Sequence, residues 1–473
     1  MIALPAPFTA LTHSHDLHLL QPGQDDVAAW SIDQRKRWHG QPLAVLLPGD
    51  TAALAAAVAL CAQHGLRMVV QGGNTGLVGG GVPDGSGQEV VISLRRMNRI
   101  RAVDPLNLCL IAEAGCTLAQ VQEAAQAHGL LFPLSLASEG SCTIGGNLAS
   151  NAGGTQVLRY GNARDLCLGL EAVSASGQVL HGLKTLRKDN SGYDLRQLLL
   201  GSEGTLAIIS AASLKLFARP QRLHTALALC SDLDQACDLL MAARSRLGPL
   251  LTAFEVMNAT ARALVRRHFP AIRQPLDGPW AVLLEWEQHG MDDATGQAQN
   301  EALWQALLAG GQAQDVALAQ SQAQAQQMWA LRESISAAQG REGLNVKHDI
   351  ALPISAIPAF CQGTDAALLA RWPGVRGVNF GHLGDGNLHY NVQAPEGEDP
   401  AAFLATHEAA INRVVFDAVQ AAGGTFSAEH GIGWLKKDEL AQRGQPLQLD
   451  WMRRIKAALD PHNLLGRGRL LDV

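Results

Sequence analysis

A short apolar stretch runs directly into a loop in which six of ten residues are glycine, and this junction restricts the possible folds more than any other feature. Residues 67–70 have the pattern of a strand, and residues 72–81 read Gly-Gly-Asn-Thr-Gly-Leu-Val-Gly-Gly-Gly. Glycines at this density cost backbone entropy, so a compact fold tolerates them where the backbone must approach another group closely. Consecutive N–H groups after a strand bind anions such as a pyrophosphate. The sequence therefore predicts a phosphate-binding loop.

Two common phosphate-binding motifs do not describe this loop. A Walker loop would continue into Gly-Lys-Ser/Thr, and none follows. A Rossmann fingerprint would need a helix and an acidic residue in register, and neither is well placed. The alternative is a flexible surface turn, which the preceding strand and a second glycine-rich loop make less attractive.

That second loop covers residues 139–154 and supplies amide and hydroxyl donors among glycines, with little charge. A third, residues 188–194, precedes Gly-Ser-Glu-Gly-Thr-Leu at residues 201–206. Three neutral, donor-rich loops suit a large neutral ring system joined to a pyrophosphate. A dinucleotide such as FAD fits that description.

Composition excludes several classes of protein. A chain of 473 residues with 47% hydrophobic and 17% charged residues predicts two or three folded domains. The net charge of -6 gives no reason to expect nucleic-acid binding. The eight cysteines form no Cys-x-x-Cys pair, so we expect reduced, buried thiols and a cytoplasmic protein. We find no signal peptide and no apolar run of the length a membrane helix needs.

The pattern of apolar residues predicts a mixed α+β chain. We expect helices at 50–65, 117–128, 233–245, 297–308, 316–329 and 449–459, and strands at 67–70, 90–94, 109–114 and 281–287. The Ala/Gln-rich stretch 310–327 is predicted to be a surface helix. The texture changes after Arg219-Pro220, which indicates a second α+β domain.

Two histidines bracket a glycine-rich turn at residues 380–389, Phe-Gly-His-Leu-Gly-Asp-Gly-Asn-Leu-His. Residues 384–387 are of the types that reverse a strand. In a four-residue loop His382 would face His389, with Cβ atoms about 5 Å apart. With a carboxylate such as Glu429 from a second segment, the two imidazoles match a three-ligand metal site with open positions. The alternative is a surface hairpin that carries two histidines.

Taken together, the motifs resemble the vanillyl-alcohol oxidase/p-cresol methylhydroxylase flavoproteins. Gly-Gly-Asn-Thr-Gly, Gly-Ser-Cys-x-Ile-Gly-Gly-Asn-x-Ala-x-Asn-Ala-Gly-Gly and Gly-Ser-Glu-Gly-Thr-Leu occur in that order. Gly-His-x-Gly-Asp-Gly-Asn-x-His and Glu-His-Gly narrow the resemblance to the branch of D-2-hydroxyglutarate dehydrogenases, D-lactate dehydrogenases and glycolate oxidase D subunits. The resemblance spans roughly residues 40 to 470.

This resemblance implies a two-part FAD-binding domain of the p-cresol methylhydroxylase type and an α+β substrate domain. We expect the FAD domain at 1–219, the substrate domain with metal ligands at 220–425, and a C-terminal segment at 426–473 that returns to the FAD domain. Residues 71–81 contain no histidine, which favours non-covalent FAD. The implied FAD contacts are Gly72, Gly73, Asn74, Thr75, Gly76, Ser141, Cys142, Gly145, Gly146, Asn147, Asn151, Ala152, Gly154, Gly161 and Ile208.

The resemblance also implies oxidation of a D-2-hydroxy acid, with transfer of the C2 hydride to flavin N5. D-2-hydroxyglutarate is the favoured substrate; D-lactate or glycolate, or a role as the flavin subunit of a multi-chain complex, are the alternatives. His382, His389 and Glu429 would hold a divalent metal, with Zn²⁺ favoured and Mn²⁺, Fe²⁺ or Co²⁺ also fitting. His430, next to a ligand and titratable near neutrality, is the expected general base.

Arg332 and Lys347 match family positions that bind substrate carboxylates. Ser336, one turn after Arg332, is expected to add a hydroxyl, and Asn387 to face flavin or substrate, whereas we expect His348 to be structural. Without the family context, Arg332 would be a helix-surface arginine paired with a nearby glutamate.

The expected partners are an electron-acceptor protein, such as an electron-transfer flavoprotein or a quinone-linked protein, and a second copy of the chain in a homodimer. Two departures from the family pattern stand out. The tail reads Leu-Leu-Gly-Arg at 464–467 where the family often has Asn-Pro-Gly-Lys, and Glu139 occupies a position where a smaller or basic residue is expected.

Overall fold

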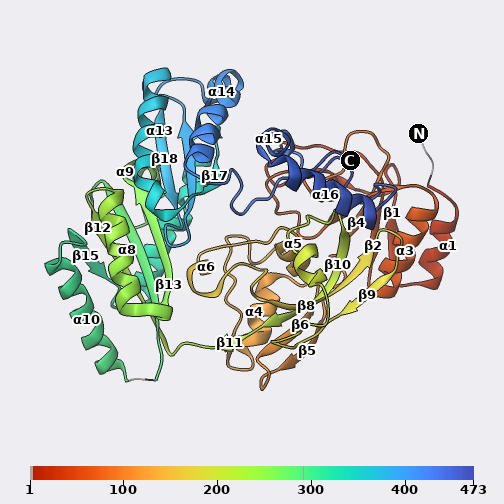
Figure 1. Cartoon of the computed structure of the whole chain (residues 1–473), viewed down its shortest axis with the longest axis horizontal. Helices are drawn as coiled ribbons and strands as arrows, with labels where there is room; N and C mark the ends of the chain where they lie inside the picture. The colour runs from red at the N-terminus through yellow and green to blue at the C-terminus, as the bar shows by residue number, and fades with distance from the viewer. Residues whose placement is uncertain (1–3, 291) are drawn as a thin grey trace. The chain divides into compact units, whose positions relative to one another are not determined.

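The structure is a computed structural model that describes residues 4–290 and 292–473 (Figure 1). Contacts between residues divide the chain into two compact units. Unit 1 comprises Met1–Gly153, of which residues 1–3 lie outside the described part, together with Gly161–Arg219 and Glu429–Val473. Unit 2 comprises Gly154–Tyr160 and Pro220–Ala428.

The first sheet of unit 1 has, among the described residues, the strand order β1–β2–β4–β3, with β2, β3 and β4 parallel to one another. The elements around it are α1 (Pro7–Ser14), β1 (Leu17–Leu20), α2 (Ala28–Ser31), β2 (Pro42–Pro48), α3 (Thr51–Gln63), β3 (Arg67–Gln71) and β4 (Glu89–Ser93). The Asp50 carboxylate accepts the N–H of Ala53 at 2.8 Å and begins α3. The predicted helix and the predicted strand that leads into the glycine loop are therefore confirmed.

The second sheet of unit 1 is antiparallel, in the order β5–β6–β10–β8–β9 for the described residues. Its elements are β5 (Ile100–Asp104), β6 (Cys109–Glu113), β8 (Cys167–Ser174), β9 (Val179–Gly182) and β10 (Ala207–Lys215). Thr117 and Gln120 form a reciprocal capping box at the start of α4 (Leu118–Gln126), as the predicted helix requires. Shorter elements are β7 (Leu130–Leu131), α5 (Ile144–Ala149), α7 (Leu195–Leu199) and β11 (Phe217–Ala218).

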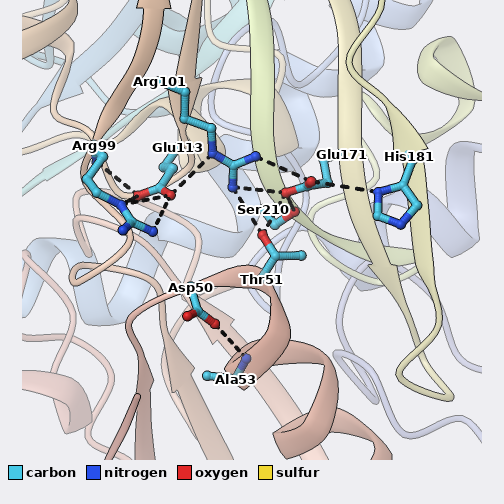
Figure 2. A network of polar contacts seen from close by, with 9 residues as sticks. All are labelled: Asp50, Thr51, Ala53, Arg99, Arg101, Glu113, Glu171, His181 and Ser210. Atoms are coloured by element: carbon cyan, nitrogen blue, oxygen red, sulfur yellow. Dashed lines mark hydrogen bonds and ion pairs between the residues drawn. The ribbon is translucent and has the colours of Figure 1, made fainter. Parts of the chain in front are cut away.

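A buried network of charges connects the second sheet to the start of α3 (Figure 2). Arg101 on β5 pairs with Glu113 at 3.2 Å and with Glu171 at 3.1 Å. Glu171 also accepts the hydroxyl protons of Thr51 at 2.6 Å and Ser210 at 2.9 Å. Burial alone raises the pKa of a carboxyl, but Arg101 and the two hydroxyls hold the pKa of Glu171 below its usual value. The second sheet is thereby joined to α3 through side chains as well as through the core.

The C-terminal segment of unit 1 contains α15 (Lys437–Arg443) and α16 (Pro446–Leu459). After α16 the chain pairs with β3 through two backbone hydrogen bonds. The N–H of Met68 donates to the Leu464 carbonyl at 2.7 Å, and the N–H of Gly466 donates to the Met68 carbonyl at 2.8 Å. Leu465 is fully buried in the core against this strand. The unusual Leu-Leu-Gly-Arg tail is thus explained by packing, because its two leucines complete the edge of the first sheet.

Unit 2 is built on an eight-stranded antiparallel sheet in its described residues, in the order β15–β12–β14–β13–β18–β19–β16, with β17 also paired to β19. The strands are β12 (Arg222–Cys230), β13 (Leu251–Asn258), β14 (Trp280–Gln288), β15 (Asp315–Leu318), β16 (Asn345–Val346), β17 (Asp349–Ala351), β18 (Arg376–Gly381) and β19 (Asn387–Gln393). The helices are α6 (Val157–Tyr160), α8 (Leu233–Leu247), α9 (Ala259–His268), α10 (Asp293–Ala309), α11 (Gln322–Glu333), α12 (Ile335–Glu342), α13 (Ile357–Arg371) and α14 (Pro400–Ala421).

Helices cover both faces of this sheet. Buried residues of α8, α10, α13 and α14 form one apolar cluster with the sheet, and those of α9, α11 and α12 form another. Successive strand residues point to opposite faces. Glu255 lies between Phe254 and Val256 of the first cluster, so its side chain points to the face covered by α9, α11 and α12.

The predicted helix at 316–329 and the predicted surface helix at 310–327 are wrong in their first halves. Asp315–Leu318 is a strand that pairs with β12, Leu318 opposite Ala226, and the helix α11 starts only at Gln322. Ser321 caps it by accepting the N–H of Gln324. The strand forms because it completes an edge of a sheet whose other strands are distant in sequence, and tertiary pairing overrides helix propensity there.

Candidate active site

In unit 1 the first glycine loop lies against the backbone of the second. A Cβ on Gly72 would be 2.3 Å from the Thr143 hydroxyl, and one on Gly73 would be 1.9 Å from the carbonyl oxygen of Ser141. A Cβ on Gly145 would be 2.7 Å from the Cβ of Ala114. Gly72 and Gly73 are required because the first loop lies directly against the second, and Gly145 is required because the second loop lies against Ala114. The sequence alone did not reveal this packing.

The same loops retain features that fit a dinucleotide phosphate. A Cβ on Gly76 would meet nothing within 4 Å, so this part of the loop borders open space. The hydroxyl of Thr143 is buried, and no hydrogen-bond partner for it occurs within the described residues. Asn74, at φ 57°, donates to the Ile32 carbonyl at 2.8 Å and holds the loop in its curved form. A backbone loop with an unused hydroxyl beside it is the kind of cradle that FAD needs.

Several other predicted FAD residues have clear structural roles in this loop region. Asn147 is buried and donates to the sulfur of Cys142, and the carboxamide oxygen of Asn151 accepts the N–H of Arg164 at 3.0 Å. Ile208 is fully buried in the core of unit 1. Contact of these residues with FAD stays a prediction.

The remaining predicted FAD positions lie partly in unit 1 and partly in unit 2. Ala152 accepts the N–H of Ala163, Gly161 has φ 77°, and Gly154 is the first residue of a short segment of unit 2. Glu139 now has an explanation, because its carboxylate accepts from the hydroxyl of Ser135 at 2.8 Å and closes its own turn. The third loop, residues 188–194, is exposed throughout.

In unit 2 the histidine hairpin forms with a register that differs from the prediction. Phe380, not His382, is opposite His389, and the N–H of Asn387 donates to the His382 carbonyl at 3.2 Å. The loop is therefore residues 383–386, one residue earlier than predicted. Asn387 belongs to β19 because it pairs with Ala351 of β17. The rings of His382 and His389 still lie close, with centroids 5.7 Å apart.

The turn is buried, which excludes the alternative of a surface hairpin. His382 is 7% exposed, and the N–H of Gly384 donates to the Phe254 carbonyl at 3.2 Å. Arg244 of α8 donates to the Gly384 carbonyl. Gly386 has φ 87°, and a Cβ there would be 2.4 Å from the Leu352 carbonyl oxygen. The turn between the two histidines is thus held by β13, by α8 and by its close fit to Leu352.

The carboxylate of Glu255 joins two residues that the sequence assigned to different tasks. Its Oε1 is 2.6 Å from Nδ1 of His382, and its Oε2 accepts Nε–H of Arg332 at 2.8 Å. Burial alone raises the pKa of this carboxyl, but the neighbouring His382 and Arg332 bring it below its usual value. The guanidinium of Arg332 also lies over the Phe380 ring, 4.8 Å from its centre. Sequence reasoning missed Glu255, although an acidic residue inside an apolar strand is a recognisable signal.

Arg332 is therefore buried and paired with a glutamate far away in sequence, not with a neighbour on its helix surface. Ser336 follows a break at Ser334, where α11 ends, and its side chain is exposed, as is Lys347. Asn387 donates to Asp349 at 3.0 Å and to the Ile350 carbonyl at 2.8 Å. Contacts of these three residues with substrate stay predictions.

His348 has the structural role expected of it. It is buried, and its ring nitrogens lie 2.7 Å from the Tyr390 carbonyl and 2.9 Å from the carboxamide oxygen of Asn412. Both contacts are inside unit 2 and join β19 to α14.

The chain reaches Glu429 along the edge of β17. Ala351 and Thr425 exchange two backbone hydrogen bonds, and the N–H of Ala428 donates to the Asp349 carbonyl at 3.2 Å. Asp349 is in turn opposite His389. Glu429 is the next residue, and there the chain passes into unit 1.

In unit 1 the Glu429-His430 segment is held by Glu203, from the Gly-Ser-Glu-Gly-Thr motif. The Glu203 carboxylate accepts the N–H groups of Ile432 and Gly433, both at 2.8 Å. Glu203 has φ 54°, which is uncommon for a residue with a side chain. Burial raises the pKa of its carboxyl above the usual range. The sequence contained this motif, but nothing in it indicated which loop the glutamate would bind.

The cysteines and the search for membrane-spanning helices concern the whole described part of the chain. The eight cysteines are free thiols, seven of them buried, as expected. Across residues 4–290 and 292–473, no helix is both long enough and apolar enough to cross a membrane.

Comparison with known proteins gives the class of this chain. Residues 42–182 match the FAD binding domain family, and residues 219–470 match the C-terminal domain of FAD linked oxidases. Solved structures of p-cresol methylhydroxylase (TM-score 0.71, 16% identity, 99% of this chain and 98% of that one) and alkyldihydroxyacetonephosphate synthase (TM-score 0.72, 16% identity, 98% and 86%) share its fold. The predicted fold of the p-cresol methylhydroxylase type is confirmed.

The chain belongs to the FAD-linked oxidases, in the branch of the D-2-hydroxyacid dehydrogenases. It is 37% identical to D-2-hydroxyglutarate dehydrogenase of Xanthomonas citri pv. viticola, covering 95% of this chain and 93% of that protein. It is 36% identical to the mitochondrial D-2-hydroxyglutarate dehydrogenase of Bos taurus, covering 94% and 79%. The predicted class, an FAD-dependent oxidoreductase, is confirmed.

Proposed function

We propose that this chain oxidises a D-2-hydroxy acid to the 2-oxo acid, using non-covalent FAD and a divalent metal ion, with D-2-hydroxyglutarate as the leading substrate. The observation that carries the proposal is the similarity to D-2-hydroxyglutarate dehydrogenases along nearly the whole chain. The joint presence of a buried histidine hairpin and a Glu-His pair supports it.

FAD, when bound, supplies the ring that takes up the two electrons removed at C2. The two glycine loops of unit 1 would hold its pyrophosphate, because they combine main-chain contact with open space at Gly76 and an unused hydroxyl at Thr143. The protein's remaining tasks are to orient the substrate and to accept the hydroxyl proton.

We assign the metal to His382, His389 and Glu429, with Zn²⁺ favoured over Mn²⁺, Fe²⁺ and Co²⁺. Two imidazole nitrogens and one carboxylate suit such an ion, and its charge lowers the pKa of a bound hydroxyl. The support is chemical. Nδ1 of His382 lies 2.6 Å from Glu255, so we assign Nε2 of the same ring as the atom that binds the metal.

His430 is the proposed general base that accepts the hydroxyl proton. It follows the proposed ligand Glu429 directly, and the two amides that Glu203 binds lie two and three residues further on. A base on a loop held this closely loses little orientation between turnovers.

Arg332 is the proposed site for a substrate carboxylate, with Lys347 adding positive charge. The Glu255 contact uses only Nε–H, so the terminal nitrogens of the guanidinium are not part of that hydrogen bond. The same contact also neutralises much of the charge of Arg332. This observation favours D-lactate or glycolate as the alternative substrate. These acids lack the distal carboxylate of 2-hydroxyglutarate and need no additional cation.

We also propose a separate electron-acceptor protein, of the electron-transfer flavoprotein or quinone-linked kind. The eight cysteines of the chain contain no Cys-x-x-Cys pair for an iron–sulfur relay, so any such relay would be another chain. A cytoplasmic location is proposed from the cysteine usage described above, and a homodimer stays an expectation.

The test is anaerobic bleaching of the flavin by a panel of acids. Purified protein should be yellow, and acid or heat precipitation should release intact FAD. D-2-hydroxyglutarate should bleach the flavin faster than D-lactate or glycolate, and the L-enantiomers should leave it oxidised. Flavin retained on denatured protein would refute non-covalent binding. Faster bleaching by D-lactate would select the alternative substrate, and a flavin that no 2-hydroxy acid bleaches would refute the function.

A further inference from the structure

Glu255 has two hydrogen-bonding neighbours that differ in one chemical respect. Arg332 always presents an N–H at Nε, because a guanidinium is not deprotonated in proteins. His382 can present either an N–H or a lone pair at Nδ1, depending on its tautomer. A carboxylate offers only acceptors, so Glu255 satisfies both neighbours when His382 carries its proton on Nδ1.

We propose that Glu255 is a positioning residue that fixes His382 in the Nδ1–H tautomer and so keeps the Nε2 lone pair directed to the metal. This inference rests on the proposed metal site. The two Glu255 contacts are short, at 2.6 Å and 2.8 Å, and the glutamate side chain is 1% exposed, so water does not compete for its oxygens. Carboxylates that bind the second nitrogen of a metal-bound histidine orient the ring and raise its basicity.

Arg332 has a defined part in this arrangement. Its Nε–H donates to one oxygen of Glu255, and its guanidinium lies over the Phe380 ring. These two contacts restrain the carboxylate, so that its other oxygen stays next to His382. The contact that neutralises Arg332 therefore also determines which atom of Glu255 faces the histidine. Substrate recognition and metal binding share one buried group.

The inference leads to a prediction for a substitution that keeps the size of the side chain. In Glu255→Gln one oxygen becomes an NH₂ group, which is only a donor. Since Arg332 must donate, the amide oxygen turns to Arg332 and the NH₂ turns to His382. Nδ1 of His382 then has to accept, its proton moves to Nε2, and the metal loses that ligand.

The experiment measures Zn²⁺ and Co²⁺ affinity of metal-depleted protein by chelator competition, and the visible spectrum of the Co²⁺ form. Glu255→Gln should weaken affinity about 10–100-fold. Glu285→Gln is the matched control, because Glu285 is also buried on the same face of the sheet but binds Trp329 and Thr225 instead. It should keep wild-type affinity. The double variant Glu255→Gln/Arg332→Leu should regain much of the loss, since the amide oxygen can then face His382.

Two results would overturn the inference: equal affinity in wild type and Glu255→Gln, or no recovery in the double variant. If Glu255→Gln does not fold, ¹⁵N-histidine NMR of the metal-depleted wild type tests the same point, with His382→Gln for assignment. A protonated Nδ1 supports the inference and a protonated Nε2 overturns it. A wild type that binds neither ion would refute the proposed metal site, while the NMR measurement would still decide the tautomer.

Discussion

At the scale of single residues, the candidate site contains charged and polar side chains that are paired with one another by hydrogen bonds. His382, Arg332 and Glu255 form one buried group, and Glu203 binds the amides two and three residues after His430. The sequence predicted the histidines because their motif is local, and it predicted Arg332 only through the family resemblance. It did not predict Glu255, which meets His382 across 127 positions, because nothing local encodes such a pair.

The metal ligands give the first prediction at this scale. His382→Ala, His389→Ala and Glu429→Ala should each lose bound metal and reduce turnover by roughly 10³-fold or more, since a metal supplies several kcal/mol to such a step. FAD should be retained, because none of the three ligands is among the predicted flavin contacts. Metal content by elemental analysis and flavin absorbance provide the two readings. Active wild type without a stoichiometric divalent ion would remove the hypothesis.

The second residue-scale prediction separates base from ligand. His430→Asn should retain both FAD and metal, yet reduce its flavin about 10²–10⁴-fold more slowly, which is the usual cost of losing a general base. Stopped-flow absorbance of the flavin measures this rate. Loss of metal from His430→Asn would mean that His430 is a ligand and that the assignment is wrong.

At the scale of elements, turns and caps were predictable and pairing registers were not. Asp50 and the Thr117 capping box begin their helices as expected, because a cap is a contact between near neighbours. The loop of the histidine hairpin lies one residue earlier than predicted, and the partner of His389 is Phe380 instead of His382, because β17 pairs with Asn387 from another part of the chain. The strand at Asp315–Leu318 was missed for the same reason.

Gly386 in the hairpin loop and Gly397 in the turn after β19 form a matched pair. Gly386 and Gly397 have φ 87° and 88°, but a Cβ would be 2.4 Å from the Leu352 carbonyl at Gly386 and would meet nothing within 4 Å at Gly397. Gly397→Ala should cost about 1 kcal/mol of unfolding free energy from the backbone alone. Gly386→Ala should cost about 3 kcal/mol and weaken metal binding, because the loop must shift. Urea denaturation compares the two, and equal costs would contradict the proposed fit of the turn.

At the scale of the whole molecule, buried or half-buried ion pairs connect the elements inside each unit, in addition to apolar packing. Arg101 with Glu113 and Glu171 does this in unit 1 (Figure 2), and Glu342 does it in unit 2. Glu342 at the end of α12 accepts from Arg376 at 2.7 Å and Arg267 at 2.9 Å. The class of fold was predictable from the order of the glycine motifs, whereas these connections depend on which strands become neighbours.

Glu342 predicts how the stability of the protein changes in acid. Burial raises the pKa of this carboxyl, but Arg376, His268 and Arg267 outweigh it and lower the pKa to about 2. A lowered pKa means stability that is present above the ordinary value near 4.5 and is lost as pH falls toward about 2. Glu342→Gln should therefore cost about 1–3 kcal/mol at neutral pH and progressively less below about pH 4.5. Urea unfolding at several pH values measures this, and a cost independent of pH would contradict it.

The most direct test of the central claim is anaerobic flavin reduction by D-2-hydroxyglutarate before and after removal of the metal. The account predicts rapid bleaching of the native protein, a rate lower by roughly 10³-fold or more after chelation, and recovery when Zn²⁺ is returned. FAD should remain bound throughout, and L-2-hydroxyglutarate should leave the flavin oxidised. Unchanged bleaching by metal-free protein would contradict the metal-dependent mechanism, and no bleaching by any 2-hydroxy acid would contradict the function.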